Sequence, residues 1–186
     1  MKTIAIYGSS IVQADHVHYE AAYQVGRALA AAGYTVMTGG YAGVMEAASK
    51  GAAEVGGHVI GVTTEVFTAL RGDGAQPNPW VVDEIRHPSL RERLTHLVLE
   101  ADGYICMPGG MGTLHELITV WELMRVGDIP TRPLLCYGDY WREMLEPIQR
   151  SPYARPQAWQ MVHFVQTPDD VVTLLHQNIS IEEKRP

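Results

Sequence analysis

The sequence contains little cysteine and no long hydrophobic run, and each shortage excludes a class of protein. Only two of its 186 residues are cysteines. Cys106 and Cys136 each lie inside an apolar segment, which favours buried free thiols over a disulfide or a metal pair. No apolar stretch approaches the ~20 residues that span a bilayer, and the opening MKTIAIYGSS is typical of a strand rather than a signal peptide. We therefore expect a cytoplasmic protein without a membrane partner.

Positive charge is also scarce. The chain has 14 lysines and arginines against 21 aspartates and glutamates, a formal net charge of −7. Because nucleic-acid binding usually needs a basic face, we expect no nucleic-acid partner. The eight histidines show no metal-ligand spacing, and we infer neither a metal site nor a cofactor.

The sequence does contain a regular alternation of short β-branched runs and helical stretches, and its length fits one domain over residues 1–186. Strands are predicted at 2–7, 34–38, 58–63, 80–85, 103–107, 133–137 and 162–166, and helices at 17–32, 43–55, 88–100, 112–126, 140–149 and 168–178. Helices of this length join parallel strands, and near-continuous apolar strands indicate a sheet covered on both faces. The sequence thus predicts a doubly wound α/β fold, with one Pro/Gly-rich loop at 64–79 that is long enough to close over a site.

Glycine-rich turns follow three of these strands, at the sheet edge where such folds bind ligands. The turns contain Gly8, Ser9 and Ser10; Gly39, Gly40 and Gly43; and Gly109, Gly110, Met111, Gly112 and Thr113. Tight strand–helix turns need glycine for geometric reasons alone, but three on one edge favour a phosphate-bearing ligand held by helix N-termini. None of the turns is a Walker A loop or a G-x-G-x-x-G motif, which argues against an ATPase or an ordinary dinucleotide site.

Glu116 has two interpretations. Thr113 and Glu116 have the spacing of a capping box, in which each side chain satisfies a backbone N–H of the other. Alternatively, a carboxylate beside a phosphate loop stabilises the oxocarbenium-like state of N-glycosidic bond cleavage. Arg91 and Arg93 flank the apolar stripe of the 88–100 helix, and periodicity does not decide which of them faces the site.

Residues 108–116, PGGMGTLHE, resemble the P-G-G-x-G-T-x-x-E signature of the LOG (Lonely Guy) family. The segments YGSS and TGGYAGVME are similar to the first two glycine loops of that family, and RER lies where its paired Arg-Lys motif stands. The resemblance covers residues 2–150. It implies a Rossmann-like fold, a homodimer, and hydrolysis of a nucleoside 5′-monophosphate, AMP or N6-modified AMP, to free base and ribose 5-phosphate.

The resemblance also assigns roles to residues. It implies a phosphate site at Gly109, Gly110, Gly112 and Thr113, with Glu116 as the catalytic carboxylate and Arg93 as the catalytic arginine. Two positions depart from the family pattern: Leu94 replaces a lysine, and His115 replaces a glutamate. A branch with the same fold is similar to molybdenum-cofactor carrier proteins, so a binding protein without turnover is the alternative.

Members of this family have also been labelled lysine decarboxylases. A pyridoxal enzyme needs a lysine for its Schiff base, and the sequence has only Lys2, Lys50 and Lys184. Lys2 opens the first strand, Lys50 lies inside a helix and Lys184 is in the charged tail. None is placed for that chemistry.

Self-association is expected from the resemblance and from apolar surface. The Ala-rich helix at 17–32 and the helix at 112–126 have more apolar side chains than one sheet face needs, in the second case Ile118, Val120, Trp121 and Met124.

Overall fold

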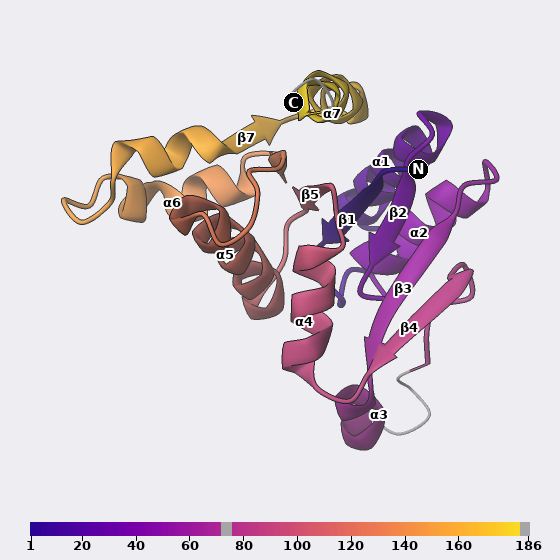
Figure 1. Cartoon of the computed structure of the whole chain (residues 1–186). Coiled ribbons are helices and arrows are strands. Elements are labelled where there is room, and N and C mark those ends of the chain that lie inside the picture. The colour runs from indigo at the N-terminus through magenta and orange to yellow at the C-terminus, as the bar shows by residue number, and fades with distance from the viewer. Residues whose placement is uncertain (72–75, 183–186) are drawn as a thin grey trace.

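The computed structural model describes residues 1–71 and 76–182, and its centre is a parallel sheet of seven strands (Figure 1). In spatial order the sheet is β4-β3-β2-β1-β5-β6-β7. The strands are β1 (Thr3–Tyr7), β2 (Thr35–Thr38), β3 (Val59–Thr64), β4 (Asp83–His87), β5 (Gly103–Cys106), β6 (Leu134–Tyr137) and β7 (Val162–Val165). The chain builds one half outward from β1 to β4 and then returns to place β5 beside β1. That reversal is the topological switch point at which doubly wound sheets bind ligands.

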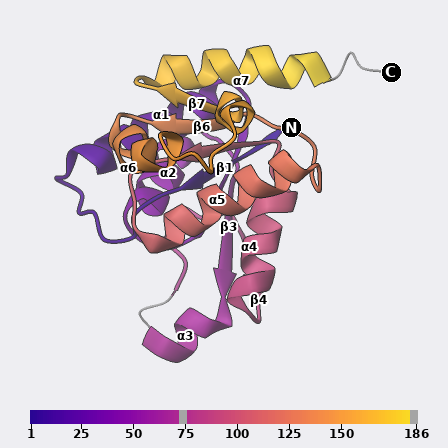
Figure 2. The same ribbon diagram turned by 90° about the vertical axis from the view of Figure 1, so that its left-hand side faces the viewer.

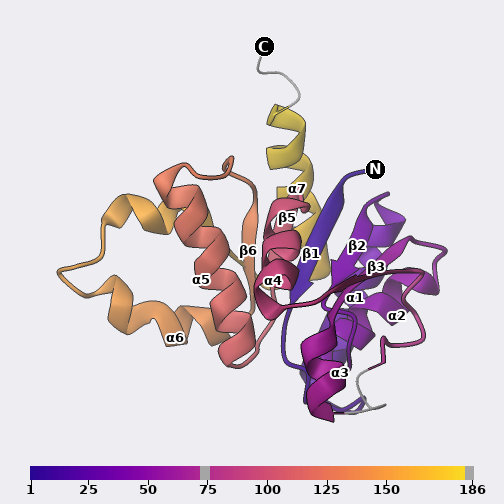
Figure 3. The same cartoon turned by 60° about the horizontal axis from the view of Figure 1, so that its bottom comes forward.

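Helices cover both faces of this sheet. One face carries α1 (Val17–Ala31), α2 (Val44–Ala53) and α7 (Pro168–Glu182), and the other carries α4 (Leu90–Leu99), α5 (Met111–Val126) and α6 (Tyr140–Gln149). Figures 2 and 3 show α5 and α6 on one side of the sheet, with α4 next to α5. The short α3 (Glu65–Arg71) continues directly from β3, and a 3-10 helix at Pro156–Met161 precedes β7. The predicted Rossmann-like α/β fold is confirmed.

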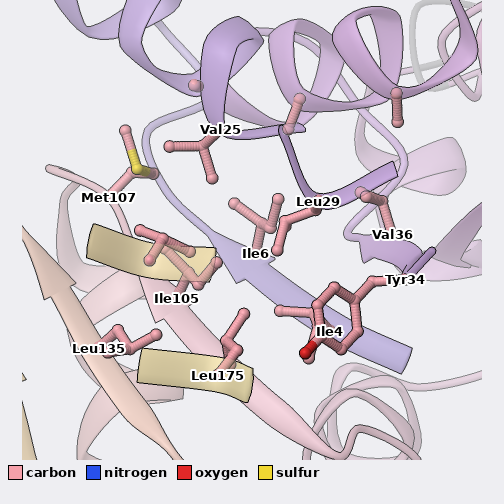
Figure 4. Packing of buried hydrophobic residues seen from close by; sticks show 14 of the residues in the cluster. Ile4, Ile6, Val25, Leu29, Tyr34, Val36, Ile105, Met107, Leu135 and Leu175 are labelled. Atoms are coloured by element: carbon pink, nitrogen blue, oxygen red, sulfur yellow. The ribbon is translucent and has the colours of Figure 1, made fainter. Parts of the chain in front are cut away.

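The period of two along β1 separates the two cores. Ile4 and Ile6 point into the layer under α1 and α7, where they pack with Val25, Leu29 and Leu175 (Figure 4). The alternate residues of β1 face the α4–α5–α6 layer. Burying each isoleucine stabilises the fold by roughly 1.5–3 kcal/mol, which fixes the register of the strand that leads into the first glycine loop.

The structure corrects the prediction between β3 and α4. The strand expected at 80–85 lies at Asp83–His87, because Val81 packs against the core from a loop and the polar DEIRH segment forms the edge strand. An edge strand pairs on one side only and tolerates exposed polar residues. The expected loop at 64–79 begins with α3, and residues 72–75 of that segment lie outside the described residues.

The two cysteines are buried free thiols, as predicted. Cys106 and Cys136 are register partners on β5 and β6, and burial raises the pKa of the Cys106 thiol. Within residues 1–71 and 76–182, no helix is long and apolar enough to cross a membrane.

Candidate active site

The three glycine loops join at the switch point into one platform. The Ser9 amide donates to the Pro108 carbonyl at 3.1 Å, and the Val44 amide donates to the Ser9 carbonyl at 2.9 Å. Gly43 makes this approach possible: its φ is +71°, and a β-carbon there would collide with the Ser9 carbonyl. The loop after β1 is thereby held between the loops after β2 and β5.

A cavity of about 270 Å³ opens above this platform. Its walls include most of the residues expected from the sequence, namely Gly8, Ser9, Ser10, Gly39, Arg93, Gly110, Met111, Gly112, Thr113 and Glu116. The structure therefore brings together the first glycine loop, Gly39 of the second loop, Arg93 of α4, and the start of α5 with Glu116, which come from four separate parts of the chain.

Three of the predicted phosphate-binding glycines, Gly40, Gly43 and Gly109, do not line the cavity. The Gly40 carbonyl accepts from Asn78, and the Gly109 carbonyl accepts from the Tyr140 hydroxyl at 2.8 Å. Each of the three shapes a loop behind the cavity wall. Direct contact of these glycines with a ligand stays a prediction.

The N-terminus of α5 offers donors to an anion. Gly110 is its N-cap, no side chain caps it, and its first turn contains no acidic residue. The first intrahelical bond runs from the Leu114 amide to the Gly110 carbonyl at 2.9 Å, so the N–H groups of Met111, Gly112 and Thr113 lack partners within the helix. These three residues line the cavity, so the N–H groups at this helix end are donors that could hold an anion.

Glu116 lies in the second turn of α5, so the capping-box interpretation is wrong. A capping box needs Thr113 as the N-cap, and Thr113 is instead the third residue of the helix. The Glu116 side chain is 14% exposed, and its Oε1 lies 3.7 Å from Nη1 of Arg93. Burial raises the pKa of Glu116 to about 7, while Arg93 opposes the shift. The carboxyl group therefore exchanges its proton near neutral pH.

Arg93 is the arginine of α4 that faces the site, and it is held firmly. Its Nε donates to the Val62 carbonyl at 2.7 Å, and its Nη2 donates to the Gly39 carbonyl at 3.2 Å. Arg93 is 8% exposed, whereas Arg91 points to solvent. The question that periodicity left open is therefore decided by packing.

Sequence reasoning missed the aromatic wall of the cavity. The rings of Tyr41 and Phe67 lie 5.7 and 5.9 Å from the Arg93 guanidinium carbon, close enough for cation–π attraction. The Tyr41 hydroxyl accepts from the Thr64 amide at 2.9 Å. Phe67 belongs to α3, and the helix-compatible run EVFTAL before the Pro/Gly-rich part of the segment was the available signal.

Tyr7 is a further lining residue that the sequence did not single out. Its hydroxyl donates to the Leu97 carbonyl at 2.9 Å, which ties β1 to α4. Burial raises the pKa of Tyr7 well above its usual value, and the nearby Glu116 carboxylate is the next largest cause. Tyr7 therefore stays neutral beside the carboxylate.

Leu94 and the lysines lie away from this cavity. Leu94 packs against the core on the α4–α5–α6 side and does not line the cavity. Lys2 pairs with Asp102 at 3.0 Å, and Lys50 lies in α2 within reach of the Tyr23 and Trp80 rings. Lys184 is outside the described residues. Neither described lysine lines the cavity.

Comparison with known proteins identifies the family of this chain. Residues 45–175 match the model of the family described as possible lysine decarboxylase, to which the P-G-G-x-G-T-x-x-E proteins belong. The chain belongs to the LOG family. It is 26% identical to a probable cytokinin riboside 5′-monophosphate phosphoribohydrolase of Oryza sativa, over 98% of this chain and 75% of that protein. It is 33% identical to the cytokinin riboside 5′-monophosphate phosphoribohydrolase of Mycobacterium marinum, over 64% of this chain and 62% of that protein.

The fold of this LOG-family chain also recurs among solved structures. The molybdenum cofactor binding protein of Rippkaea orientalis superimposes with a TM-score of 0.73 over 95% of this chain and 96% of that one, at 23% sequence identity. At that identity the likeness concerns the fold alone. The two proteins share a scaffold, and the residues that each places on it decide its chemistry.

Proposed function

We propose that this protein is a nucleoside 5′-monophosphate phosphoribohydrolase, which cleaves the N-glycosidic bond of AMP or N6-modified AMP to free base and ribose 5-phosphate. The observation that carries the proposal is the Glu116–Arg93 pair, with 3.7 Å between Oε1 and Nη1, in the same cavity as the uncapped start of α5. An anion site and a carboxylate within one cavity of about 270 Å³ suit a ribose 5-phosphate.

Each group has a distinct role in the proposed reaction. The amides of Met111, Gly112 and Thr113 bind the 5′-phosphate and fix the ribose against Glu116. As the bond to the base breaks, positive charge develops on the ribose, and the Glu116 carboxylate stabilises it or activates the attacking water. Arg93 offsets the negative charge of phosphate and carboxylate, which keeps both anions in one cavity.

The alternative is a nucleotide-binding or molybdenum-cofactor carrier protein without turnover. The likeness in fold to a molybdenum cofactor binding protein is consistent with this alternative, and Leu94 in place of the family lysine is the feature that favours it. Leu94 packs against the core and is not part of the described cavity wall. A leucine at this position therefore serves packing and leaves the lining of the cavity unchanged. We therefore favour the hydrolase.

The first prediction is a strict need for phosphate. AMP is expected to be cleaved with a kcat/KM at least about 100-fold above that of adenosine, because binding energy from the phosphate at α5 positions the ribose for reaction. Chromatography of free adenine measures both rates, with adenosine plus inorganic phosphate as the matched control. Equal rates on nucleotide and nucleoside would refute the phosphate site.

We further propose a homodimer, and here the surface argument needs correction. Val120, Trp121 and Met124 are buried in the core, and of the apolar residues expected on α5 only Ile118 is exposed. Exposed apolar side chains nevertheless cluster on α5 and α6, where Ile118 and Ile148 line a groove. This groove supports pairing through these helices.

Sedimentation tests the dimer. Wild type is expected to be dimeric at micromolar concentration, and Ile118→Arg is expected to weaken association at least about tenfold by placing a charge in an apolar interface. Val82→Arg, at an exposed apolar position before β4, is the matched control and should leave association unchanged. A monomeric wild type would contradict the proposal.

A further inference from the structure

A second, smaller cavity adjoins the first. It measures about 190 Å³ and shares Ser10 and Tyr41 with the cavity that contains Glu116. Its other walls come from the loop after β2, the start of α2 and the segment before β4, namely Ala42, Glu46, Gln76, Asn78 and Pro79. A ligand whose phosphate lies at α5 and whose sugar lies at Glu116 can extend past Tyr41 into this space.

Most polar groups in this second cavity already have hydrogen-bond partners or do not discriminate between donor and acceptor groups of a ligand. Asn78 donates to the carbonyls of Gly40 and Tyr41 at 3.1 and 3.0 Å, and its Oδ1 accepts from the Trp80 amide at 3.2 Å. The Tyr41 hydroxyl is bound to Thr64. The hydroxyl of Ser10 and the amide of Gln76 can each donate or accept, so neither selects one kind of ligand group.

Glu46 differs from all of these groups. It lies in the first turn of α2 and is half-buried, and no hydrogen bond or ion pair within residues 1–71 and 76–182 engages its carboxylate. An ionised carboxylate only accepts hydrogen bonds, so this wall of the cavity demands a donor.

We propose that the second cavity is the base subsite and that Glu46 selects bases that carry an exocyclic amino group. The inference rests on the proposed function for the position of phosphate and ribose, and adds the residue that selects the base. An amino group at the edge of the base donates an N–H to Glu46. An oxo group at the same place sets its lone pairs against the carboxylate and leaves both groups unsatisfied.

The test compares nucleotides that differ at the 6-position edge of the purine, where AMP has an amino group beside an acceptor N1 and IMP has an oxo group beside a protonated N1. Wild type is expected to release base from AMP with a kcat/KM about 10- to 100-fold above that for IMP, the range of a hydrogen bond to a charged group. Glu46→Gln replaces an obligatory acceptor with a group that can also donate, so the AMP/IMP ratio should fall about tenfold or more. Glu46→Asp keeps the carboxylate and should keep a preference for AMP. Glu54→Gln, at the far end of α2 and outside both cavities, should leave the ratio unchanged.

Calorimetric binding of AMP and IMP separates this inference from the proposed function. If wild type releases no base from any nucleotide, the hydrolase proposal fails, and the ratio of the two affinities still decides the role of Glu46. A wild-type preference for AMP that Glu46→Gln reduces supports the inference in either assay. Equal use of AMP and IMP by wild type, or an unchanged ratio in folded Glu46→Gln, would overturn it.

Discussion

Replacement of Glu116 by glutamine is expected to lower the rate of base release from AMP by about 10³-fold or more, with little change in nucleotide affinity. Glutamine keeps the shape of the side chain but removes the charge that the ribosyl cation needs in the transition state. Single-turnover release of adenine measures the rate, and calorimetry measures the affinity. Glu122→Gln is the matched control, because Glu122 is exposed on the same helix and pairs with Arg125 outside the cavity.

The same variant is expected to be more stable than wild type at alkaline pH. The pKa of Glu116 is raised from 4.5 to about 7 by burial, so the folded state holds its proton more tightly than the unfolded state does. Stability is therefore lost as the pH rises from 4.5 to 7, by at most about 3 kcal/mol, and a glutamine does not titrate. Urea unfolding at pH 5 and pH 8 should show the gain only at pH 8, while wild-type turnover rises with pH around 7. Unchanged turnover in a folded variant would refute the catalytic role.

Local patterns were sufficient for the framework of the fold. In β1, Ile4 and Ile6 face one core and the alternate residues face the other, which is the period of two of a strand buried on both faces. The helices between the strands indicate parallel connections. The prediction failed where the sheet ends. The apolar residues before Asp83 pack from a loop, and the edge strand itself is polar, so hydrophobicity placed β4 too early in the chain.

The site was predictable only in part, since its parts are distant in sequence. The glycine loops follow their strands directly and were found from local motifs. The pairing of Arg93 with Glu116 depends on how α4 packs against α5, and no periodicity decides between Arg91 and Arg93. Tyr41 and Phe67 meet over the guanidinium because α3 continues from β3. That contact is a product of the tertiary structure.

Replacement of Arg93 by alanine is the second change for which we expect a large effect, and it should lower activity for two reasons. It removes the cation that offsets the charges of phosphate and carboxylate. It also removes the cation that holds the pKa of Glu116 down against burial, so less of the carboxylate is ionised at pH 7. We expect turnover to fall about 10³-fold or more, and the residual pH profile to shift to higher pH. Arg91→Ala, an exposed change two residues away on the same helix, should leave both unchanged.

Stability distinguishes a catalytic arginine from a merely structural one. Loss of the guanidinium leaves the Val62 and Gly39 carbonyls without their donor, which should cost about 1–3 kcal/mol for each buried group. Arg93→Lys retains a charge but not both hydrogen bonds, so it should recover part of the turnover while the fold stays weakened.

In a carrier protein, wild type would bind nucleotide without releasing base, and Arg93→Ala would reduce affinity alone. Base release by wild type and the three arginine variants at saturating AMP therefore decides between hydrolase and carrier, since only a hydrolase has turnover for the arginine to support.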